Sequence, residues 1–493
     1  MPLRAAAITF ALVLLVSACS SGTNDSTTTT THSAEDVSVT SIEPPVETTS
    51  TAALASTTPS DDAPEIWAGD VAGQMLQLQF VVDSTGTISG TAGSPGQEEI
   101  GEIPIDGVLD GTSVQIRIPA VSARFDAEIA GDTMSGTWFQ SGSEVTVTLE
   151  RQSEPVVIAR PQEPVPPFPY ESMDVRFDNG DVSLAGTLVI PEGDGPFPAV
   201  VLTSGSGAQD RDETLLGHKP FLVLADAFAR SGIASLRFDD RGVGGSTGDP
   251  IGATSAELAT DTAAAVEFLD ADPRTGSIGL VGHSEGGIIG PMVAAESATV
   301  EYSVLLAGPA LPGSDVLIRQ TEDLMRAEGS PEADIEWQIG WRSEIIKVSA
   351  SDASNEDAAE QIRTIASTAL ANPPADVTIP LDPSLAEEFV TAFTDPWMRY
   401  FLAYDPAPAL EALDIPVLAL IGSLDVQVSA EENISALESA LAGNAAATVS
   451  ELDGLNHLFQ TAKTGAVSEY STIEETFAPW AIDIITAWIL EQT

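Results

Sequence analysis

Residues 171–493 alternate between short apolar runs and segments with helical character. The apolar runs, which we predict to be strands, are residues 182–190, 199–203, 233–238, 278–281, 302–307, 417–421 and 447–452. Several of these runs are unbroken, which is typical of strands buried on both faces of a parallel sheet. Strands that alternate with helices indicate an α/β domain. We therefore predict a mostly parallel sheet flanked by helices.

Helix signals fill the spaces between these runs. Thr254 and Glu257 form a capping-box pattern that opens a helix to about residue 269, and Thr472 and Glu475 repeat the pattern before the last helix. Between about residues 311 and 394 the alternation breaks into several helical stretches that contain Trp337 and Trp341. This region is predicted to be a helical insertion that forms a lid over the carboxyl edge of the sheet.

The region before this domain has the sequence pattern of an all-β fold. Within residues 63–150, apolar and polar residues alternate over 75–82, 113–118 and 144–149, and turn residues separate these stretches. Period-two runs at short spacing predict a small sandwich or barrel. It has no histidine or cysteine, so we interpret it as a structural or accessory module, with binding of cell-surface material as the alternative. Residues 151–170 are proline-rich and predict a semi-rigid extended linker.

The first 62 residues have the character of a targeting segment and a tether. Arg4 precedes an apolar run over residues 5–16, and small residues lead to Cys19, the single cysteine of the chain. The segment 1–19 resembles a bacterial lipoprotein signal, which implies lipidation at Cys19 and an extracytoplasmic body anchored to a membrane. An ordinary secretory signal is the alternative. Residues 20–62 are rich in Ser and Thr and predict an unfolded tether.

The charge and cysteine content exclude several classes of partner and site. Lys plus Arg number 19 and Asp plus Glu number 74, which gives a net charge of −55. Nucleic-acid binding requires clustered cations, so we expect no nucleic-acid partner. A single cysteine permits neither an intrachain disulfide nor a cysteine-based zinc site. The oligomeric state is left open.

The pattern Gly-x-Ser-x-Gly occurs twice, and only one copy has the context that nucleophilic catalysis needs. The copy at 244–248 lies well past its strand and is followed by Asp249-Pro250 instead of a helix. The copy at 282–286 follows the strand 278–281 and precedes a helical segment. That context predicts a nucleophile elbow that presents Ser284 at a helix N-terminus.

A serine nucleophile needs a base, and the base needs an orienting acid. In a fold of this kind the chain order is Ser, then Asp or Glu, then His. His457 is the one histidine well after Ser284, and it follows the strand 447–452. Asp425 lies just after the strand 417–421 and is the predicted acid; Asp453 and Asp414 are the rivals.

Backbone amides are expected to complete the site as an oxyanion hole. One donor is the N–H of Glu285, the residue after the nucleophile. The other is expected from the glycine-containing loop 203–213, where we favour the N–H of Ser206, with Gly207 as its alternative.

Four segments together resemble the EstD-type bacterial carboxylesterases of the α/β-hydrolase superfamily, which are also serine aminopeptidase-like hydrolases. These segments are SGSGAQDRDE at 204–213, DDRGVGGS at 239–246, GHSEGG at 282–287 and LNHLFQ at 455–460, and the segment 397–406 is also similar. The resemblance covers about residue 170 to the end. It implies an α/β-hydrolase fold and places nucleophile, acid and base at Ser284, Asp425 and His457.

The resemblance and the spacing together predict a serine esterase that acts on a small-molecule ester and needs neither a metal nor an organic cofactor. Trp397, Tyr400 and Phe401 are candidates for the acyl pocket, or they pack the helical insertion. One alternative is an aminopeptidase-type peptidase, in which Glu285 would hold a free amino terminus. Another is a surface binding protein with a vestigial hydrolase domain, and thioesterase or lactonase activity is also open. The loop 239–246 is interpreted as structural, with Arg241 in a salt bridge.

Overall fold

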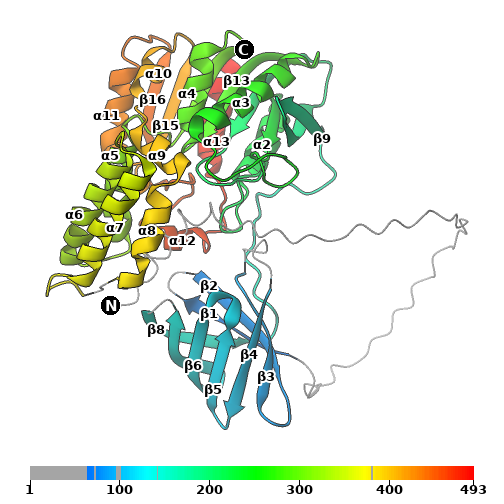
Figure 1. The fold of residues 1–493 in the computed structure, drawn as a ribbon. Helices are drawn as coiled ribbons and strands as arrows, with labels where there is room; N and C mark the ends of the chain where they lie inside the picture. The colour runs from blue at the N-terminus through cyan, green and yellow to red at the C-terminus, as the bar shows by residue number, and fades with distance from the viewer. Residues whose placement is uncertain (1–63, 72–73, 96–101, 141–142, 379–380) are drawn as a thin grey trace, which may run out of the picture.

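The computed structural model describes residues 64–71, 74–95, 102–140, 143–378 and 381–493 (Figure 1). The predicted signal, Cys19 and the tether 20–62 lie outside these described residues. Within the described ranges, no helix is both long and apolar enough to cross a membrane.

The N-terminal unit is a closed barrel of eight antiparallel strands, each paired with the next and the last with the first. The strands are β1 (Glu65–Val71), β2 (Gln74–Val82), β3 (Thr87–Gly93), β4 (Ile103–Asp110), β5 (Ser113–Ile118), β6 (Ala123–Ala130), β7 (Thr133–Gln140) and β8 (Ser143–Gln152), with a short 3-10 helix η2 (Pro119–Val121) after β5. Alternate residues point inward, so that Trp67, Leu78, Phe125 and Leu149 fill a packed apolar core. The all-β prediction is confirmed, and closure leaves no free edge strand.

The C-terminal unit contains an eight-stranded sheet in the order β16-β15-β14-β13-β11-β12-β10-β9. Its strands are β9 (Tyr170–Asn179), β10 (Val182–Pro191), β11 (Phe197–Thr203), β12 (Ala234–Phe238), β13 (Thr275–His283), β14 (Val300–Leu306), β15 (Val417–Gly422) and β16 (Ala447–Leu452). The β10 strand runs antiparallel to β9 and β12, and the pairs from β12 to β16 are parallel. This mostly parallel sheet confirms the predicted α/β-hydrolase fold.

Strand β9 is absent from the sequence prediction. It forms the outer edge of the sheet, and only Phe177 among its residues is buried. Because the strand has few buried apolar side chains, its sequence lacks the run of apolar residues that marks the inner strands.

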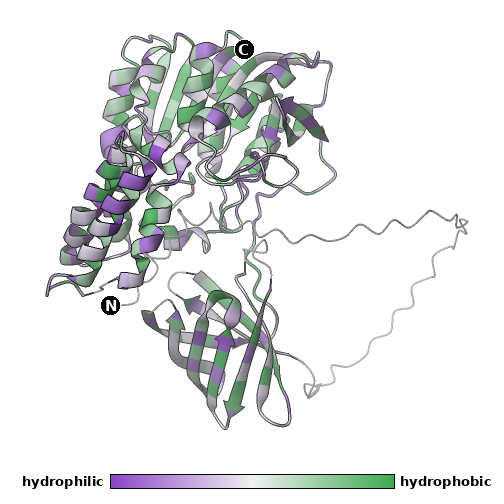
Figure 2. Cartoon of the chain, viewed as in Figure 1, coloured by the Kyte–Doolittle hydropathy of each residue, from purple (hydrophilic) through white to green (hydrophobic). Residues whose placement is uncertain are grey.

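Helices cover both faces of the sheet. One face packs against α3 (Ser255–Asp270), α4 (Gly286–Glu296), α10 (Ala407–Glu411) and α11 (Ala430–Ala440), and the other packs against α2 (Pro220–Arg230) and α13 (Pro479–Glu491). Figure 2 shows the strands of this sheet as mainly hydrophobic. The sheet therefore lies between two apolar layers, and its loops carry the polar chemistry.

Between β14 and β15 the chain forms the predicted helical insertion. It contains α5 (Gly313–Ala327), α6 (Glu332–Ser349), α7 (Asn355–Ala371), a 3-10 helix η3 (Pro383–Leu385), α8 (Ala386–Phe393) and α9 (Pro396–Ala403). These helices have an apolar core of their own that includes Trp341, Ile362 and Leu402. The insertion thus extends past residue 394, because α9 packs with the other insertion helices.

One of the two predicted capping boxes is present. The Thr254 side chain accepts from the Glu257 amide while Glu257 binds the Thr254 amide, as expected at the start of α3. The box predicted at Thr472 and Glu475 is wrong. The last helix begins at Pro479, and Glu475 accepts from the Thr461 amide, because the intervening chain folds back as α12 (Val467–Tyr470) and a loop.

The proline-rich linker is docked on the C-terminal unit. Arg160 donates to the carbonyl oxygens of Leu216, Gly217, Ser471 and Ile473. Gln162 adds three hydrogen bonds to the backbone at Thr476 and Phe477. These two polar side chains fix the path of the linker, which contains a turn closed by the hydrogen bond from the Glu163 amide to the Arg160 carbonyl oxygen.

Candidate active site

The second Gly-x-Ser-x-Gly copy forms a sharp turn between β13 and α4. Ser284 has a φ of 52°, a strained left-handed conformation for a residue other than glycine. A Cβ on Gly282 would come within 2.0 Å of the Gly286 carbonyl oxygen, and a Cβ on Gly286 within 2.1 Å of the Thr203 carbonyl oxygen. Both glycines are therefore required by the close approach of backbone that presents Ser284 at the start of α4.

His457 and Asp425 meet at the same edge of the sheet. The Nδ1 of His457 lies 2.8 Å from Oδ2 of Asp425, and both side chains are buried. The Oδ1 atom of Asp425 accepts from the amides of Gln427 and Val428, each at 2.8 Å. These bonds hold the carboxylate so that its other oxygen faces the imidazole.

The two rival acids do not reach the histidine. Asp453 accepts from the Ser423 hydroxyl at 3.4 Å. Asp414 lies before β15, at the opposite end of that strand from Asp425. The structure thus brings Asp425 to His457 and leaves both rivals outside.

Two reactive atoms have no hydrogen-bond partner within the described part of the chain. They are the hydroxyl of Ser284, which is partly exposed, and Nε2 of His457. The imidazoles of His457 and His283, the residue before the nucleophile, have centroids 4.8 Å apart. The predicted base and the predicted nucleophile therefore lie on neighbouring segments, and neither atom is engaged by another described residue.

The loop after β11 packs directly on the elbow. A Cβ on Gly205 would lie 3.1 Å from the Cβ of Ser284, so a glycine permits the close approach. Among the described residues, the amides of Ser206, Gly207 and Glu285 have no acceptor. The loop and the start of α4 therefore offer free N–H donors beside the serine, as expected for the predicted oxyanion hole.

The side chain of Glu285 is buried under the helical insertion. Its Oε1 accepts from Ser255 Oγ at 2.5 Å and from the indole N–H of Trp397 at 2.8 Å. Its Oε2 is buried and has no hydrogen-bond partner in the described residues. Burial raises the pKa of this carboxyl, and the hydrogen bonds from Ser255 and Trp397 only partly oppose that shift.

The three aromatic candidates all lie on α9, and they differ in what they touch. Trp397 binds the elbow residue Glu285 and stacks on Phe401, with ring centroids 5.5 Å apart. Tyr400 stacks instead on Tyr404 at 5.8 Å. The structure therefore brings Trp397 to the elbow, with Phe401 stacked on it, and Tyr400 belongs to a different stack.

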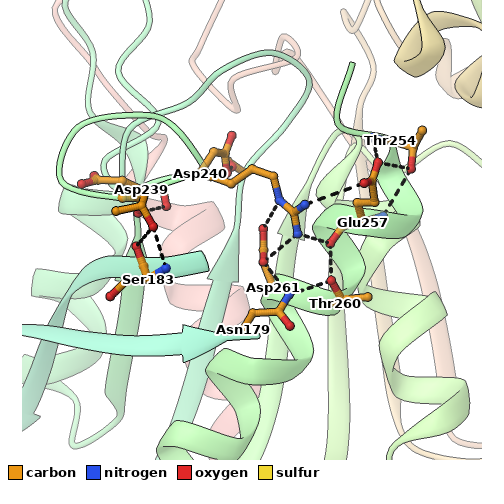
Figure 3. Close-up of polar contacts among 12 residues, drawn as sticks. Asn179, Ser183, Asp239, Asp240, Thr254, Glu257, Thr260 and Asp261 are labelled. Atoms are coloured by element: carbon orange, nitrogen blue, oxygen red, sulfur yellow. Dashed lines mark hydrogen bonds and ion pairs between the residues drawn. The ribbon is translucent and has the colours of Figure 1, made fainter. Parts of the chain in front are cut away.

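The loop 239–248, which contains the first Gly-x-Ser-x-Gly copy, has a structural role: its side chains bind neighbouring strands and helix α3. Arg241 forms a two-pronged ion pair with Asp261, which also accepts from Asn179 (Figure 3). The Ser246 hydroxyl donates to the Asp239 carbonyl oxygen at 2.7 Å and accepts from the Ala185 amide at 2.9 Å. The predicted salt bridge of Arg241 is confirmed, and Ser246 is occupied in backbone hydrogen bonds.

A second buried carboxyl lies at the start of this loop. Asp240 binds the Ser204 hydroxyl at 3.1 Å and the Gln209 amide at 2.9 Å. Burial raises the pKa of Asp240 to about 8, although these two hydrogen bonds lower it. Asp240 therefore ties the loop after β12 to the loop after β11 as a group that is mostly protonated at neutral pH.

The residues that sequence reasoning missed are Glu213 and the role of His283. Glu213 was only part of a motif, yet its Oε1 lies 2.8 Å from Nδ1 of His283. The one available signal was a histidine beside the nucleophile, and spacing along the chain does not show which acid faces it. In the described ranges, no group of three or more His, Cys, Asp or Glu side chains is arranged to hold a metal ion.

Comparison with known proteins places this fold and site in a family. A family model described as X-Pro dipeptidyl-peptidase (S15 family) matches residues 179–449. The chain belongs to this S15 family. The matched segment runs from the end of β9 into β16 and so contains the elbow and the acid strand.

This S15 family member is also similar to Esterase EstD of Thermotoga maritima, with 28% identity over 294 residues. That match covers 60% of this chain and 61% of the relative, so the resemblance to EstD-type proteins is confirmed over that part. Among solved structures, a Pyrococcus furiosus esterase has 16% identity and a TM-score of 0.42 over 66% of this chain and 91% of its own. Est1E of Butyrivibrio proteoclasticus has 14% identity and a TM-score of 0.38, covering 65% and 98%.

Proposed function

We propose that this chain is a serine carboxylesterase. The observation that carries the proposal is the Asp425–His457 hydrogen bond at the same sheet edge as an elbow serine with positive φ. The chain order Ser284, Asp425, His457 is the order expected of α/β-hydrolases. The likeness to Esterase EstD supports an ester as the substrate.

In the proposed reaction, Ser284 Oγ attacks the ester carbonyl carbon while His457 Nε2 takes its proton. Asp425 holds Nδ1–H and stabilises the imidazolium that forms. The amides of Ser206 and Glu285 donate to the oxyanion of the tetrahedral intermediate. The imidazolium then protonates the departing alcohol, which leaves an acyl-enzyme on Ser284. Water, deprotonated by His457, attacks the acyl carbonyl and releases the acid.

The test is hydrolysis of p-nitrophenyl esters from acetate to palmitate by a form that begins at residue 61 and so retains every described residue. Ser284→Ala should reduce kcat by up to about 10⁶-fold, because the nucleophile is lost. The matched control is Ser246→Ala, which changes the serine of the other Gly-x-Ser-x-Gly copy and should keep turnover within a few-fold. Equal loss in both variants, or no turnover by the unaltered chain, would overturn the proposal.

A peptidase acting on a free amino terminus is the second candidate. The S15 family description favours it, and so does the buried, unpaired Oε2 of Glu285 beside the nucleophile. If this candidate holds, X-Pro p-nitroanilides are cleaved, and Glu285→Gln abolishes that cleavage while ester turnover persists. Ester turnover with no anilide cleavage rejects it.

We also propose that the protein is attached to a membrane outside the cytoplasm through acyl chains on Cys19. The support is the apolar run 5–16 and the placement of the one cysteine after Val16-Ser17-Ala18. Growth of a bacterial host with an alkyne-tagged fatty acid should label the full chain, and Cys19→Ser should remove the label. Equal labelling of both forms would reject the anchor.

A further inference from the structure

His283, the residue before the nucleophile, connects three loops of the site. Its Nδ1 lies 2.8 Å from Glu213 Oε1, and its Nε2 lies 2.9 Å from the carbonyl oxygen of His457. The same Glu213 oxygen accepts from the Gly205 amide at 2.6 Å. His283 therefore links the loop after β11, the elbow and the loop that carries the base.

These contacts fix the number of protons in the unit. A carbonyl oxygen only accepts, so Nε2 of His283 must carry a proton. The contact between Nδ1 and Oε1 needs a second proton between those atoms. An imidazolium beside a carboxylate satisfies all three bonds and makes the contacts of Oε1 charge-assisted, whereas a neutral imidazole would require a protonated Oε1 that also accepts from Gly205.

Charge and burial agree with this assignment. Burial alone lowers the pKa of His283, but Glu213, the His457 carbonyl and Asp425 together raise that pKa above its ordinary value. The titratable groups that face the ring are Glu213, Asp425 and the imidazole of His457, whose centroid is 4.8 Å away. Two carboxyls near one buried ring favour its charged form.

We propose that the His283–Glu213 ion pair is a positioning unit that holds His457 and the loop of Ser206 in register with Ser284. It acts on the base through the His457 backbone and on the predicted oxyanion hole through the Gly205 amide, which precedes Ser206. The pair does not touch the reacting atoms, so His283 and Glu213 are positioning residues. This inference rests on the proposed esterase function.

The protonation state can be measured without activity. In the form that begins at residue 61 the histidines are His218, His283 and His457, so ¹⁵N-histidine labelling gives few ring signals. The signals lost in His283→Asn identify this residue. Because its pKa is raised above the ordinary value, His283 should keep both ring protons to a higher pH than an ordinary histidine does. A ring that loses its second proton at or below the ordinary pKa of a histidine would overturn the proposal.

Glu213→Gln tests the consequence for catalysis. The amide keeps the size of the carboxyl but cannot compensate an imidazolium, and no single orientation satisfies both Gly205 N–H and a neutral His283 that still donates to His457. We expect kcat to fall by about 10–100-fold with KM changed by less than about threefold, as is typical when a supporting partner is lost. The variant should also lose activity at a lower pH than the unaltered chain as the pH is raised.

Glu328→Gln is the matched control. Glu328 is also buried and accepts a backbone N–H, that of Ser468 at 3.1 Å. Within the described part of the chain its hydrogen bonds go to the amide and hydroxyl of Ser468, and not to the elbow or to the loops that His283 joins. It should keep both kcat and the pH profile, and Glu213→Asp should recover part of the lost kcat. Melting temperatures separate misfolding from misplacement. An active Glu213→Gln variant with an unchanged kcat and pH profile refutes the positioning unit alone, whereas an inactive unaltered chain refutes the proposed function.

Discussion

At the scale of single residues, the carboxyl edge of the sheet contains acids that are buried beside hydroxyls and amides. Asp240 binds Ser204 and Gln209, and Glu285 binds Ser255 and Trp397. A buried carboxyl of this kind favours its neutral form, because desolvation costs more for the charged form. Such groups make the stability of the fold depend on pH, and Asp240 does so without a part in the proposed reaction.

Asp240→Asn should remove the pH dependence of stability that the Asp240 carboxyl causes. The folded pKa of about 8 lies above the ordinary value of 3.8, so the folded state retains a proton that the unfolded chain releases between these values. The free energy of unfolding of the unaltered protein therefore falls as the pH rises through this range, by at most about 1.4 kcal/mol per pH unit from this group.

Urea unfolding at several pH values between about 5 and 9 checks this prediction. The asparagine side chain can still bind Ser204 and Gln209, so the variant should gain stability relative to the unaltered chain as the pH increases. A stability difference that stays constant with pH would contradict a raised pKa at Asp240.

At the scale of elements, a hydrogen bond joins α9 to the elbow. The indole N–H of Trp397 donates to Glu285 Oε1, and Trp397 stacks on Phe401 within the same helix. Asp395 caps this helix by accepting from the amides of Trp397 and Met398. The insertion is therefore linked to the elbow through a helix whose start is capped and whose tryptophan binds Glu285, the residue after the predicted nucleophile.

Trp397→Phe should loosen α9 on the elbow. The ring stack can remain, but the hydrogen bond to a buried carboxyl is lost, at a cost of about 1–2 kcal/mol. We expect a lower melting temperature and a higher KM for esters, with a smaller change in kcat. Trp337→Phe, in α6, is the control, since that indole N–H has no acceptor in the described residues. Equal effects of the two substitutions would argue against a specific contact.

At the scale of the whole molecule, the barrel and the sheet domain have separate apolar cores, and the linker between them is fixed on the sheet domain. Arg160 and Gln162 together satisfy backbone groups in two loops that lie far from them in sequence. The linker is therefore held on the sheet domain at Arg160 and Gln162, while nearer the barrel the Val156 amide donates to the Gln77 side chain of β2 at 2.6 Å.

Two fragments of the chain test how much the linker contacts stabilise the sheet domain. Residues 153–493 keep Arg160 and Gln162, and residues 170–493 lose both. The longer fragment should retain ester turnover, since the elbow and its loops are intact. The shorter fragment should melt about 5 °C lower or more, because several buried carbonyl and amide groups lose their partners. Identical melting temperatures by circular dichroism would show that the linker contacts contribute little.

Local sequence patterns were sufficient to predict most of the fold and most residues of the candidate site. Unbroken apolar runs marked the inner strands because burial on both faces removes polar residues from them. The glycines around Ser284 identified the elbow, because only glycine fits the contacts of 2.0 and 2.1 Å that a Cβ would make at Gly282 and Gly286. The chain order then selected Asp425 and His457, which the structure places 2.8 Å apart.

Only the tertiary structure determined the partners that are distant in sequence. Glu213 meets His283 across 70 positions, and Arg160 meets Ile473 across 313. The edge strand β9 and the start of α13 at Pro479 also escaped prediction, because neighbouring segments and not local propensity decide them. A sequence pattern reports which side chains a strand or turn requires. The packing of the loops decides which acceptor each buried charged group meets. Desolvation makes any arrangement that leaves such a group without a partner unfavourable, so only the folded structure shows the pairing.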